Sequence, residues 1–323
     1  MDTNISVQMR HLGKTDIMVT PIGLGVMEFA GGGGLIGFMF PIIPQEEKNT
    51  IIKAALDGGI NWFDTAEAYG AGVSERSLAT ALKAAGKSDK DVIVETKWQP
   101  FFRTAGNIPH SIKDRINFLD GFSIANYMVH NPSSFSSPEA EMNAMADLVE
   151  AGKIRSVGVS NFNPARMRKA HAALAKRGLP LAVNQVKYSL LSREIETNGI
   201  LDTARELGVT IIAYTPLARG LLSGKYHKNS ELLSRMSGWQ KMSIRGNLEQ
   251  SRKLINAMDE IATKYEVTIA QVALNWVINF KGEIIVTIPA ATKVRQAEEN
   301  AGAMMFRLSD DDMARLDDVS RRL

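Results

Sequence analysis

The chain has 323 residues, of which 45% are hydrophobic and 23% are charged, with 38 Lys and Arg, 35 Asp and Glu, and no cysteine. This composition excludes a disordered chain, a disulfide scaffold, thiolate nucleophiles, iron–sulfur clusters and thiolate zinc sites. The net charge is only +3, and the sequence has no run of basic residues interleaved with aromatic ones, so we expect no nucleic-acid partner.

The N-terminus lacks a basic start followed by an apolar run, and no stretch approaches the roughly 20 apolar residues that span a bilayer. We therefore expect a cytoplasmic protein without a membrane partner.

The chain opens with two short apolar segments, residues 9–12 and 17–19, which flank a polar turn containing Gly13. This pattern predicts an N-terminal β-hairpin over residues 9–19. Short β-branched runs then alternate with longer segments that carry apolar residues at helical spacing. The predicted strands are residues 22–25, 61–64, 92–96, 124–129, 154–159, 182–186, 210–214 and 284–288. The predicted helices include residues 46–56, 75–84, 138–150, 164–174, 200–207, 248–265 and, at the C-terminus, 309–321.

Strands that alternate with helices predict an α/β protein with a parallel sheet, and eight such units favour a closed (β/α)8 TIM barrel. We expect one domain over residues 1–323, with the N-terminal hairpin and C-terminal helix added to the barrel. The alternative, a doubly wound open sheet, would normally bring a G-x-G-x-x-G turn, and Gly23 and Gly25 are not followed by its third glycine.

Two segments depart from a regular barrel pattern. A glycine-rich stretch, residues 31–37, lies in a long loop over residues 26–44, which is either a mobile surface loop or a lid over the active site. The helical segment around residues 111–119 is expected to be short and irregular.

Polar side chains follow three neighbouring strands, at the barrel end where active sites lie. Asp64 ends the second predicted strand, with Tyr69 five positions later, while Lys97 and His130 follow the third and fourth. Each residue alone has a structural explanation, as a helix cap, a core aromatic, an ion pair or a turn residue. Four proton-handling groups at successive strand ends nevertheless point to acid–base catalysis.

The motifs that carry these residues resemble those of the aldo-keto reductases, in the subgroup similar to potassium-channel β-subunits. They span nearly the whole chain, in the family's order and spacing. The motifs are Asp64-Thr-Ala-x-x-Tyr69-Gly70, Thr96-Lys97, His130, Gly152-Lys-Ile-Arg-x-x-Gly-Val-Ser160-Asn161, Asn184-Gln185, the segment 214–226, Ile288-Pro289 and Glu299-Asn300.

The resemblance implies hydride transfer from a nicotinamide to a carbonyl carbon, with Tyr69 as general acid. Lys97 would lower the pKa of Tyr69, and Asp64 would hold Lys97 in place. His130 would donate a hydrogen bond to the substrate oxygen. This chemistry requires no metal, and His130 has no second ligand at the spacing of a zinc hydrolase.

The resemblance also implies NADP(H) as the cofactor. Ser160, Asn161 and Gln185 would bind the carboxamide, Tyr214 would stack on the ring, and the loop over residues 216–225 would close on the pyrophosphate. The full expected set is Gly25, Met27, Asp64, Ser160, Asn161, Gln185, Tyr214, Thr215, Pro216, Leu217, Ala218, Gly220, Lys225, Ala290, Thr292, Lys293, Gln296, Glu299 and Asn300.

The expected 2′-phosphate site departs from the common family pattern. Many members have Lys and Arg where this chain has Ala290 and Gln296, and members with Gly-Ala at the first of these positions also have glutamine at the second. Lys293 and Arg295 remain as phosphate candidates, the alternative being solvated charges at a helix start.

For the substrate we expect an aldehyde or ketone with a hydrophobic part, contacted by Met27, Phe29, Trp98 and His130. Phe101, Phe102 and Trp239 are further aromatic candidates, although any one of them could belong to the core or the surface.

The expected function is NADPH-dependent reduction of a carbonyl to an alcohol, and the only macromolecular partner left open is a further copy of the chain. One alternative is an NADP(H)-binding regulatory or auxiliary subunit with little turnover. A barrel isomerase or aldolase with Lys97 as a Schiff-base nucleophile would not explain Tyr69, Gln185 or the loop over residues 216–225.

Overall fold

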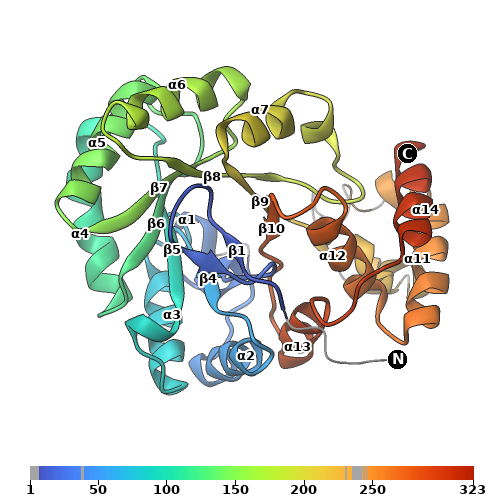
Figure 1. Cartoon of the computed structure of the whole chain (residues 1–323). Coiled ribbons are helices and arrows are strands. Elements are labelled where there is room, and N and C mark those ends of the chain that lie inside the picture. Colours follow the sequence, from blue (N-terminus) through green and yellow to red (C-terminus); the bar gives the residue numbers. More distant parts are fainter. Residues whose placement is uncertain (1–6, 38–39, 230, 235–241, 243, 245) are drawn as a thin grey trace.

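The eight β-branched runs form one parallel sheet of eight strands in the computed structural model, which describes residues 7–37, 40–229, 231–234, 242, 244 and 246–323 (Figure 1). Neighbours along the chain are neighbours in the sheet, so the fold is built from successive β-α units. The strands are β3 (Leu24–Gly25), β4 (Trp62–Asp64), β5 (Ile93–Trp98), β6 (Ile124–Val129), β7 (Ile154–Ser160), β8 (Leu181–Lys187), β9 (Thr210–Tyr214) and β10 (Ile285–Thr287).

The sheet closes between its first and last strands. Ile22 is bridged to Thr287 and Gly25 to Ala290, both in parallel orientation. The Gly23 N–H donates to the Thr287 carbonyl at 2.8 Å. Closure leaves no unpaired edge among the described barrel strands, and it confirms the predicted barrel.

Helices surround the barrel on its outside (Figure 1). Ser137 shows why one of them begins where it does, since its hydroxyl accepts the Ala140 N–H at 3.2 Å and proline follows at the first helical position. The helices are α1 (Gly34–Gly37), α2 (Gln45–Asp57), α3 (Val73–Ala84), α4 (Ile108–Leu119), α5 (Pro138–Glu150), α6 (Pro164–Ala175), α7 (Ile200–Leu207), α8 (Lys225–Lys228), α9 (Glu231–Ser234), α11 (Arg252–Tyr265), α12 (Ile269–Asn279), α13 (Val294–Gly302) and α14 (Asp310–Arg321). Short 3-10 turns occur at η1 (Met27–Ala30), η2 (Asp89–Asp91), η3 (Ala105–Asn107), η4 (Glu194–Glu196) and η5 (Ala218–Ser223).

The expectation of a short, irregular helix around residues 111–119 is wrong. Helix α4 has 12 residues, as many as α3 and α6. Its pattern misleads because Arg115 occupies a core-facing position, where its guanidinium nitrogen Nε lies 3.1 Å from the Glu75 carboxylate. A charged residue that is paired inside the protein breaks the apolar periodicity without breaking the helix.

The predicted hairpin, β1 (Arg10–His11) and β2 (Met18–Val19), closes the bottom of the barrel. Leu12, Ile17 and Val19 are fully buried in a cluster with Trp62 and other inward-facing side chains. Gly13 has a φ of 58°, and a Cβ there would approach the Ala182 carbonyl oxygen to 2.4 Å. The hairpin therefore seals the barrel floor, and the active site must open at the opposite end.

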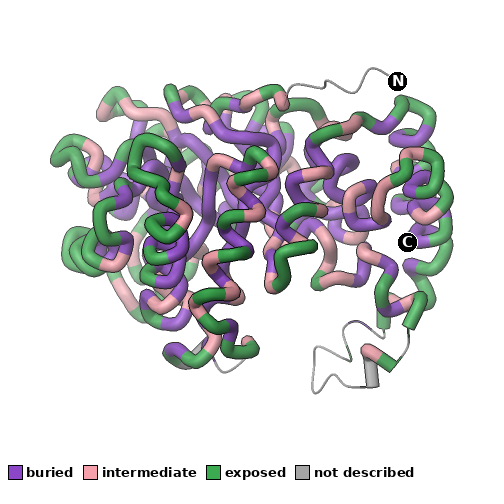
Figure 2. The backbone as a smooth tube through the Cα atoms, turned by 90° about the horizontal axis from the view of Figure 1, so that it is seen from below, coloured by how far each residue is buried: buried purple, intermediate pink, exposed green. Residues whose placement is uncertain are grey.

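The buried residues run through the barrel and the inner faces of its helices, as the purple tube in Figure 2 shows. Exposed residues lie on the outer helix faces and loops (Figure 2). In the described part of the chain no helix is both long and apolar enough to cross a membrane.

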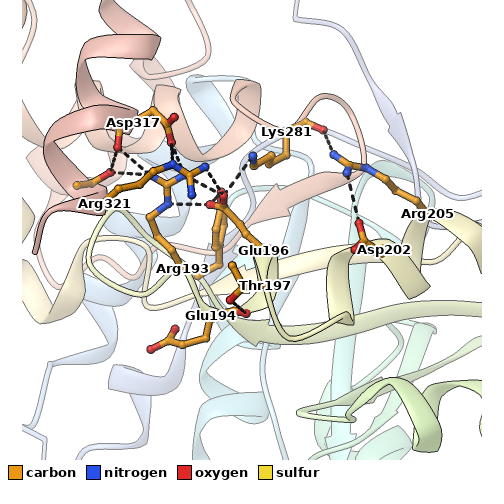
Figure 3. A network of polar contacts seen from close by, with 11 residues as sticks. Arg193, Glu194, Glu196, Thr197, Asp202, Arg205, Lys281, Asp317 and Arg321 are labelled. Carbon is orange, nitrogen blue, oxygen red and sulfur yellow. Dashed lines mark hydrogen bonds and ion pairs between the residues drawn. The ribbon is translucent and has the colours of Figure 1, made fainter.

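The C-terminal helix α14 is tied to the loop after β8 by a network of ion pairs (Figure 3). Arg193 contacts Glu196 at 2.8 Å and Asp317 at 2.5 Å. Lys281 and Arg321 reach the same Glu196 carboxylate at 3.1 and 3.3 Å. Because the Glu196 and Arg193 side chains are largely buried, this network holds the helix against the barrel.

The glycine-rich segment packs against the loop that follows β4. A Cβ at Gly33 would come within 2.5 Å of Val73 and 2.8 Å of the Gly70 carbonyl oxygen. The glycines thus allow η1 and α1 to approach residues 70–73 closely. Residues 38–39 of the expected loop lie outside the described residues, and the expected lid stays a prediction.

Candidate active site

Asp64, Tyr69, Lys97 and His130 come from the carboxyl ends of three adjacent strands. Asp64 ends β4, Lys97 lies one residue before the end of β5, and His130 directly follows β6. Tyr69 lies in the turn after β4, where its N–H donates to the Ala66 carbonyl at 3.0 Å.

The four side chains converge on one point. The Lys97 Nζ donates to Asp64 Oδ2 at 2.6 Å and to the Thr65 carbonyl at 2.8 Å. The same Nζ lies 5.1 Å from the centre of the Tyr69 ring. The Tyr69 and His130 rings meet edge to face, with centroids 5.5 Å apart and planes at 80°. The structure therefore brings together the four residues that the sequence singled out.

The Asp64–Lys97 pair is buried, and both Asp64 oxygens accept hydrogen bonds. Neither side chain has more than 2% of its surface exposed, and Gln185 Nε2 donates to the second Asp64 oxygen at 2.9 Å. Burial alone would lower the pKa of Lys97, but the adjacent Asp64 carboxylate and Tyr69 more than offset it, so this pKa lies above its ordinary value. Lys97 therefore carries a positive charge beside Tyr69.

The pKa of Tyr69 departs from the sequence-based expectation. Burial raises the pKa of this phenol above its usual value, and the opposing effect of Lys97 does not cancel that rise. Lys97 does lower the pKa of Tyr69, as expected, but burial outweighs it and the pKa stays above its ordinary value. Tyr69 is a neutral phenol, the protonation state that a general acid needs.

His130 is a neutral imidazole. Burial, followed by the charge of Lys97, lowers its pKa to about 3. Its Nδ1 is buried and has no hydrogen-bond partner among the described residues. A neutral imidazole carries one N–H donor, which suits an uncharged acceptor such as a carbonyl oxygen.

Glu67 is a residue that the sequence analysis missed and that fixes the Tyr69 turn. Its carboxylate accepts the Gln99 N–H at 2.9 Å, Arg103 Nη1 at 2.6 Å and the Ser111 hydroxyl at 3.1 Å. These bonds tie the loop after β4 to the loop after β5 and to α4. The signal in the sequence that could have identified Glu67 is its place two positions before Tyr69.

Glu28, also missed, lies in η1 beside the predicted Met27. Burial raises the pKa of its carboxyl to about 7, and its Oε2 has no partner among the described residues. It is close enough to Tyr69 to raise the pKa of that phenol. The signal in the sequence that could have identified Glu28 is a single carboxyl group between the apolar residues Met27 and Phe29.

The residues expected to hold the nicotinamide follow β7, β8 and β9. Asn161 Nδ2 donates to the Ser160 hydroxyl at 3.1 Å, and the Tyr214 hydroxyl donates to Asn161 Oδ1 at 3.0 Å. Gln185 joins this group to the catalytic residues through Asp64. The barrel mouth thus has a catalytic side and a polar, partly exposed side, joined by Gln185.

The loop after β9 has an unusual backbone. Thr215, Ala218 and Arg219 are non-glycine residues with φ between 47° and 57°, and Gly220 follows at 86°. Left-handed residues of this kind cost about 1 kcal/mol or more each and gather at functional sites. A Cβ on Gly220 would lie 2.9 Å from Lys225 Nζ, so the lysine amino group covers this loop. Backbone N–H groups beside a lysine fit a phosphate-binding loop, and the expected contacts Pro216 and Leu217 belong to the same turn.

The expected adenine end of the site surrounds the start of α13. Gln296 Oε1 accepts the Thr292 N–H at 2.7 Å, and Asn300 Nδ2 donates to the Ala290 carbonyl at 3.3 Å. The two expected phosphate cations are each paired with a carboxylate, Lys293 with Glu47 at 2.6 Å and Arg295 with Glu299 at 3.0 Å. A 2′-phosphate would compete with these surface pairs, which are weak.

The expected substrate contacts separate into buried and exposed side chains. Phe29 and Trp98 have no exposed surface, and the Trp98 indole N–H donates to Asn107 at 3.0 Å. The structure therefore places both side chains in the hydrophobic core, and their contact with a substrate stays a prediction. Met27 is partly exposed, and Trp239 lies outside the described residues.

Phe101 and Phe102 are 58% and 73% exposed. They form an aromatic patch with Phe135, a residue that the sequence analysis missed, and the Phe102 and Phe135 ring centroids lie 6.3 Å apart. The patch comes from the loops after β5 and β6, the strands that end near Lys97 and His130.

Among the residues that the structure describes, no cluster of three His, Asp or Glu side chains could hold a metal ion.

Comparison with known proteins gives concordant matches. A sequence model described as "Aldo/keto reductase family" matches residues 21–321. The chain is 33% identical over 314 residues to a chloroplastic pyridoxal reductase of Arabidopsis thaliana, covering 93% of this chain and 83% of that protein. It is 30% identical to the aldo-keto reductase yakc of Schizosaccharomyces pombe, whose name specifies NADP(+), over 95% of this chain and 89% of that protein. A glycerol dehydrogenase structure from Gluconobacter oxydans superposes with a TM-score of 0.80 at 26% identity, covering 98% of this chain and 96% of that one.

Proposed function

This chain belongs to the aldo/keto reductase family, a family of oxidoreductases that generally reduce carbonyl groups with a nicotinamide cofactor, and we propose that it reduces an aldehyde or ketone to an alcohol with NADPH, Tyr69 being the general acid. The observation that carries this proposal is the position of Lys97 Nζ, held by Asp64 at 2.6 Å and lying 5.1 Å from the Tyr69 ring.

Tyr69 gives its hydroxyl proton to the carbonyl oxygen. When bound, the reduced nicotinamide supplies the hydride for the carbonyl carbon. Loss of the proton leaves a phenolate, which the adjacent Lys97 charge stabilises at the moment it forms. Asp64 and the Thr65 carbonyl hold that ammonium group in place, so little reorganisation is needed during the reaction.

His130 orients the carbonyl. Its neutral ring lies against Tyr69, with centroids 5.5 Å apart, and in this proposal its one N–H points at the oxygen that Tyr69 protonates. Two donors at a single oxygen favour the negative charge that develops there.

Ser160, Asn161, Gln185 and Tyr214 hold the nicotinamide end of NADPH in this proposal, and the loop after β9 with Lys225 holds the diphosphate. The support is the left-handed backbone of that loop and the lysine over it. The name of the yeast relative, which specifies NADP(+), favours the phosphorylated cofactor.

The substrate in this proposal is a carbonyl compound with an apolar part. The exposed aromatic patch of Phe101, Phe102 and Phe135 beside the catalytic strand ends supports it. The Arabidopsis relative is named for pyridoxal, which is an aldehyde with a flat aromatic ring and thus a carbonyl compound of the proposed kind.

The test is to mix the protein with NADPH and a panel of aliphatic and aromatic aldehydes and ketones and to follow nicotinamide absorbance. We expect Tyr69→Phe to lower kcat by about 100-fold or more, the usual contribution of a positioned acid. The Kd for NADPH should stay within about twofold, since the hydroxyl acts on the carbonyl.

Tyr265→Phe is the matched control, because it removes a tyrosine hydroxyl that binds Asp312 on the outer helices. Equal loss of turnover and NADPH binding in Tyr69→Phe would contradict the general-acid role. Tight NADPH binding by the unmodified protein without reduction of any carbonyl would favour the regulatory alternative.

A further inference from the structure

One buried carboxyl group next to the catalytic pair has no part in the mechanism above. Glu95 is fully buried in β5, two residues before Lys97. Alternate residues of a strand face the same side, so both side chains point into the barrel. Glu95 is paired in the sheet register with Asp64 of β4 on one side and with Asn126 of β6 on the other.

Glu95 has few polar partners. Its Oε1 accepts one hydrogen bond from Asn126 Nδ2 at 3.2 Å, and its Oε2 has no partner among the described residues. The charged groups that face it are Asp64 from β4 and Lys97 from its own strand. From β7, the Ser156 hydroxyl donates to the Ala125 carbonyl at 2.8 Å and lies 3.2 Å from Asn126 Oδ1, with no hydrogen bond to Glu95. The neighbouring side chains inside the barrel include the buried apolar residues Met128 and Val183.

This environment favours the ionised form of one of the two carboxyl groups, Asp64 and Glu95, but not of both. Asp64 accepts hydrogen bonds from the Lys97 ammonium group and the Gln185 amide, so Asp64 is the carboxyl group that is ionised. An ionised Glu95 would be a second charge in a dry core, with an amide as its sole hydrogen-bonding partner among the described residues. Burial and the Asp64 charge accordingly raise the pKa of Glu95 to about 8.

We propose that Glu95 is a positioning residue for carbonyl reduction: a neutral acid beneath the Asp64–Lys97 pair, whose ionisation sets the alkaline limit of turnover. The inference rests on the proposed function. Neutral Glu95 leaves the whole Lys97 charge to stabilise the Tyr69 phenolate. Ionised Glu95 cancels part of that charge and makes Tyr69 a weaker acid.

The first test compares pH profiles of kcat between about pH 6 and pH 10 for the unmodified protein and Glu95→Gln. The glutamine of that variant keeps the acceptor for Asn126 and cannot ionise. We expect the alkaline fall in kcat to move up by about one pH unit or more, while kcat near pH 6.5 stays within about threefold. An unchanged alkaline limb would overturn the proposal.

The control is Glu141→Gln. Glu141 is also fully buried, accepts one hydrogen bond from Ser134 at 2.5 Å and leaves Oε2 without a partner among the described residues, but it lies on α5 outside the barrel. Its pKa is likewise raised by burial. The profile of this variant should match that of the unmodified protein, and an equal shift in both variants would contradict a specific role for Glu95.

A second readout does not depend on turnover. Infrared difference spectra between the unmodified protein and Glu95→Gln should show a protonated carboxyl band at neutral pH that disappears as the pH rises. If no carbonyl is reduced, the proposed function fails while this titration still decides the state of Glu95. A carboxylate already ionised at neutral pH would overturn the inference. If Glu95→Gln does not fold, the spectra of Glu95→Asp, which keeps a titrating group, take its place.

Discussion

At the scale of single residues, the site depends on one positive charge held inside the protein. Lys97 has no exposed surface, and Asp64 is its one carboxylate partner at ion-pair distance among the described residues. Moving such charges out of water is costly, so each depends on the other for its place in the core.

We predict that Lys97→Met lowers the free energy of unfolding by about 3–5 kcal/mol, because it leaves Asp64 as an unpaired buried charge. Asp64→Asn in the same chain should recover part of this loss. Urea unfolding of the two single variants and the double variant measures the coupling. Additive losses would mean that the pair does not stabilise the fold as a unit.

At the scale of elements, the strand ends and the loops after them determine what the site can bind. The start of α13 places Lys293 and Arg295 at one edge of the site, where each exposed cation is paired with one partly buried carboxylate. Helix α14 lies elsewhere, held by Arg193 (Figure 3). Changes at these two elements should therefore affect different properties, cofactor choice and stability.

We predict that Lys293→Ala with Arg295→Ala raises the Kd for NADPH by about tenfold and leaves the Kd for NADH nearly unchanged, because only NADPH carries the 2′-phosphate. Titration of protein fluorescence with each cofactor measures this. Lys53→Ala, which removes an exposed lysine paired with Asp57, is the control. An equal rise for both cofactors would place the phosphate contacts at other residues.

For α14 we predict that Arg193→Ala costs about 2 kcal/mol or more of unfolding free energy, since charged hydrogen bonds to Glu196 and Asp317 are lost from a largely buried network. Arg168→Ala, which breaks the exposed pair with Glu206, should cost less than about 1 kcal/mol. Thermal and urea unfolding compare the two. Similar costs would show that the network adds no more than a surface pair.

At the scale of the whole molecule, buried carboxyls make the stability depend on pH. Burial raises the pKa values of Glu28 and Glu75 to about 7 and, together with Asp64, that of Glu95 to about 8, from an ordinary 4.5. Between the ordinary pKa of 4.5 and these raised values, the folded state binds more protons than the unfolded state, so stability falls as pH rises. His130 acts oppositely, since its pKa falls from 6.5 to about 3 and its contribution is complete above 6.5.

We predict that the urea midpoint of unfolding decreases between pH 6.5 and 8, where the carboxyls lose their protons and the contribution of His130 no longer changes with pH. The decrease should be smaller in Glu75→Gln, whose side chain cannot ionise. A midpoint that rises over this interval would contradict the raised pKa values.

Much of the architecture was predictable because barrel strands are local and periodic. The runs at 124–129 and 210–214 match β6 and β9 at both ends, and residues 138–150 match α5. Prediction failed where a polar group faces the core. Arg115 concealed the length of α4, and Glu95 and Glu67 were overlooked because each has partners from other strands or loops.

The sequence by itself determined the closed barrel, the family and the four proton-handling residues, because strand periodicity and motif spacing are properties of the chain read locally. The tertiary structure decided the charge states. Tyr69 has a raised pKa because burial outweighs Lys97, and His130 is neutral because it is buried beside that cation. Burial and distance between strands exist only once the barrel has closed. The composition at the outset excluded cysteine chemistry, and only the folded site shows how a buried lysine and a neutral tyrosine meet.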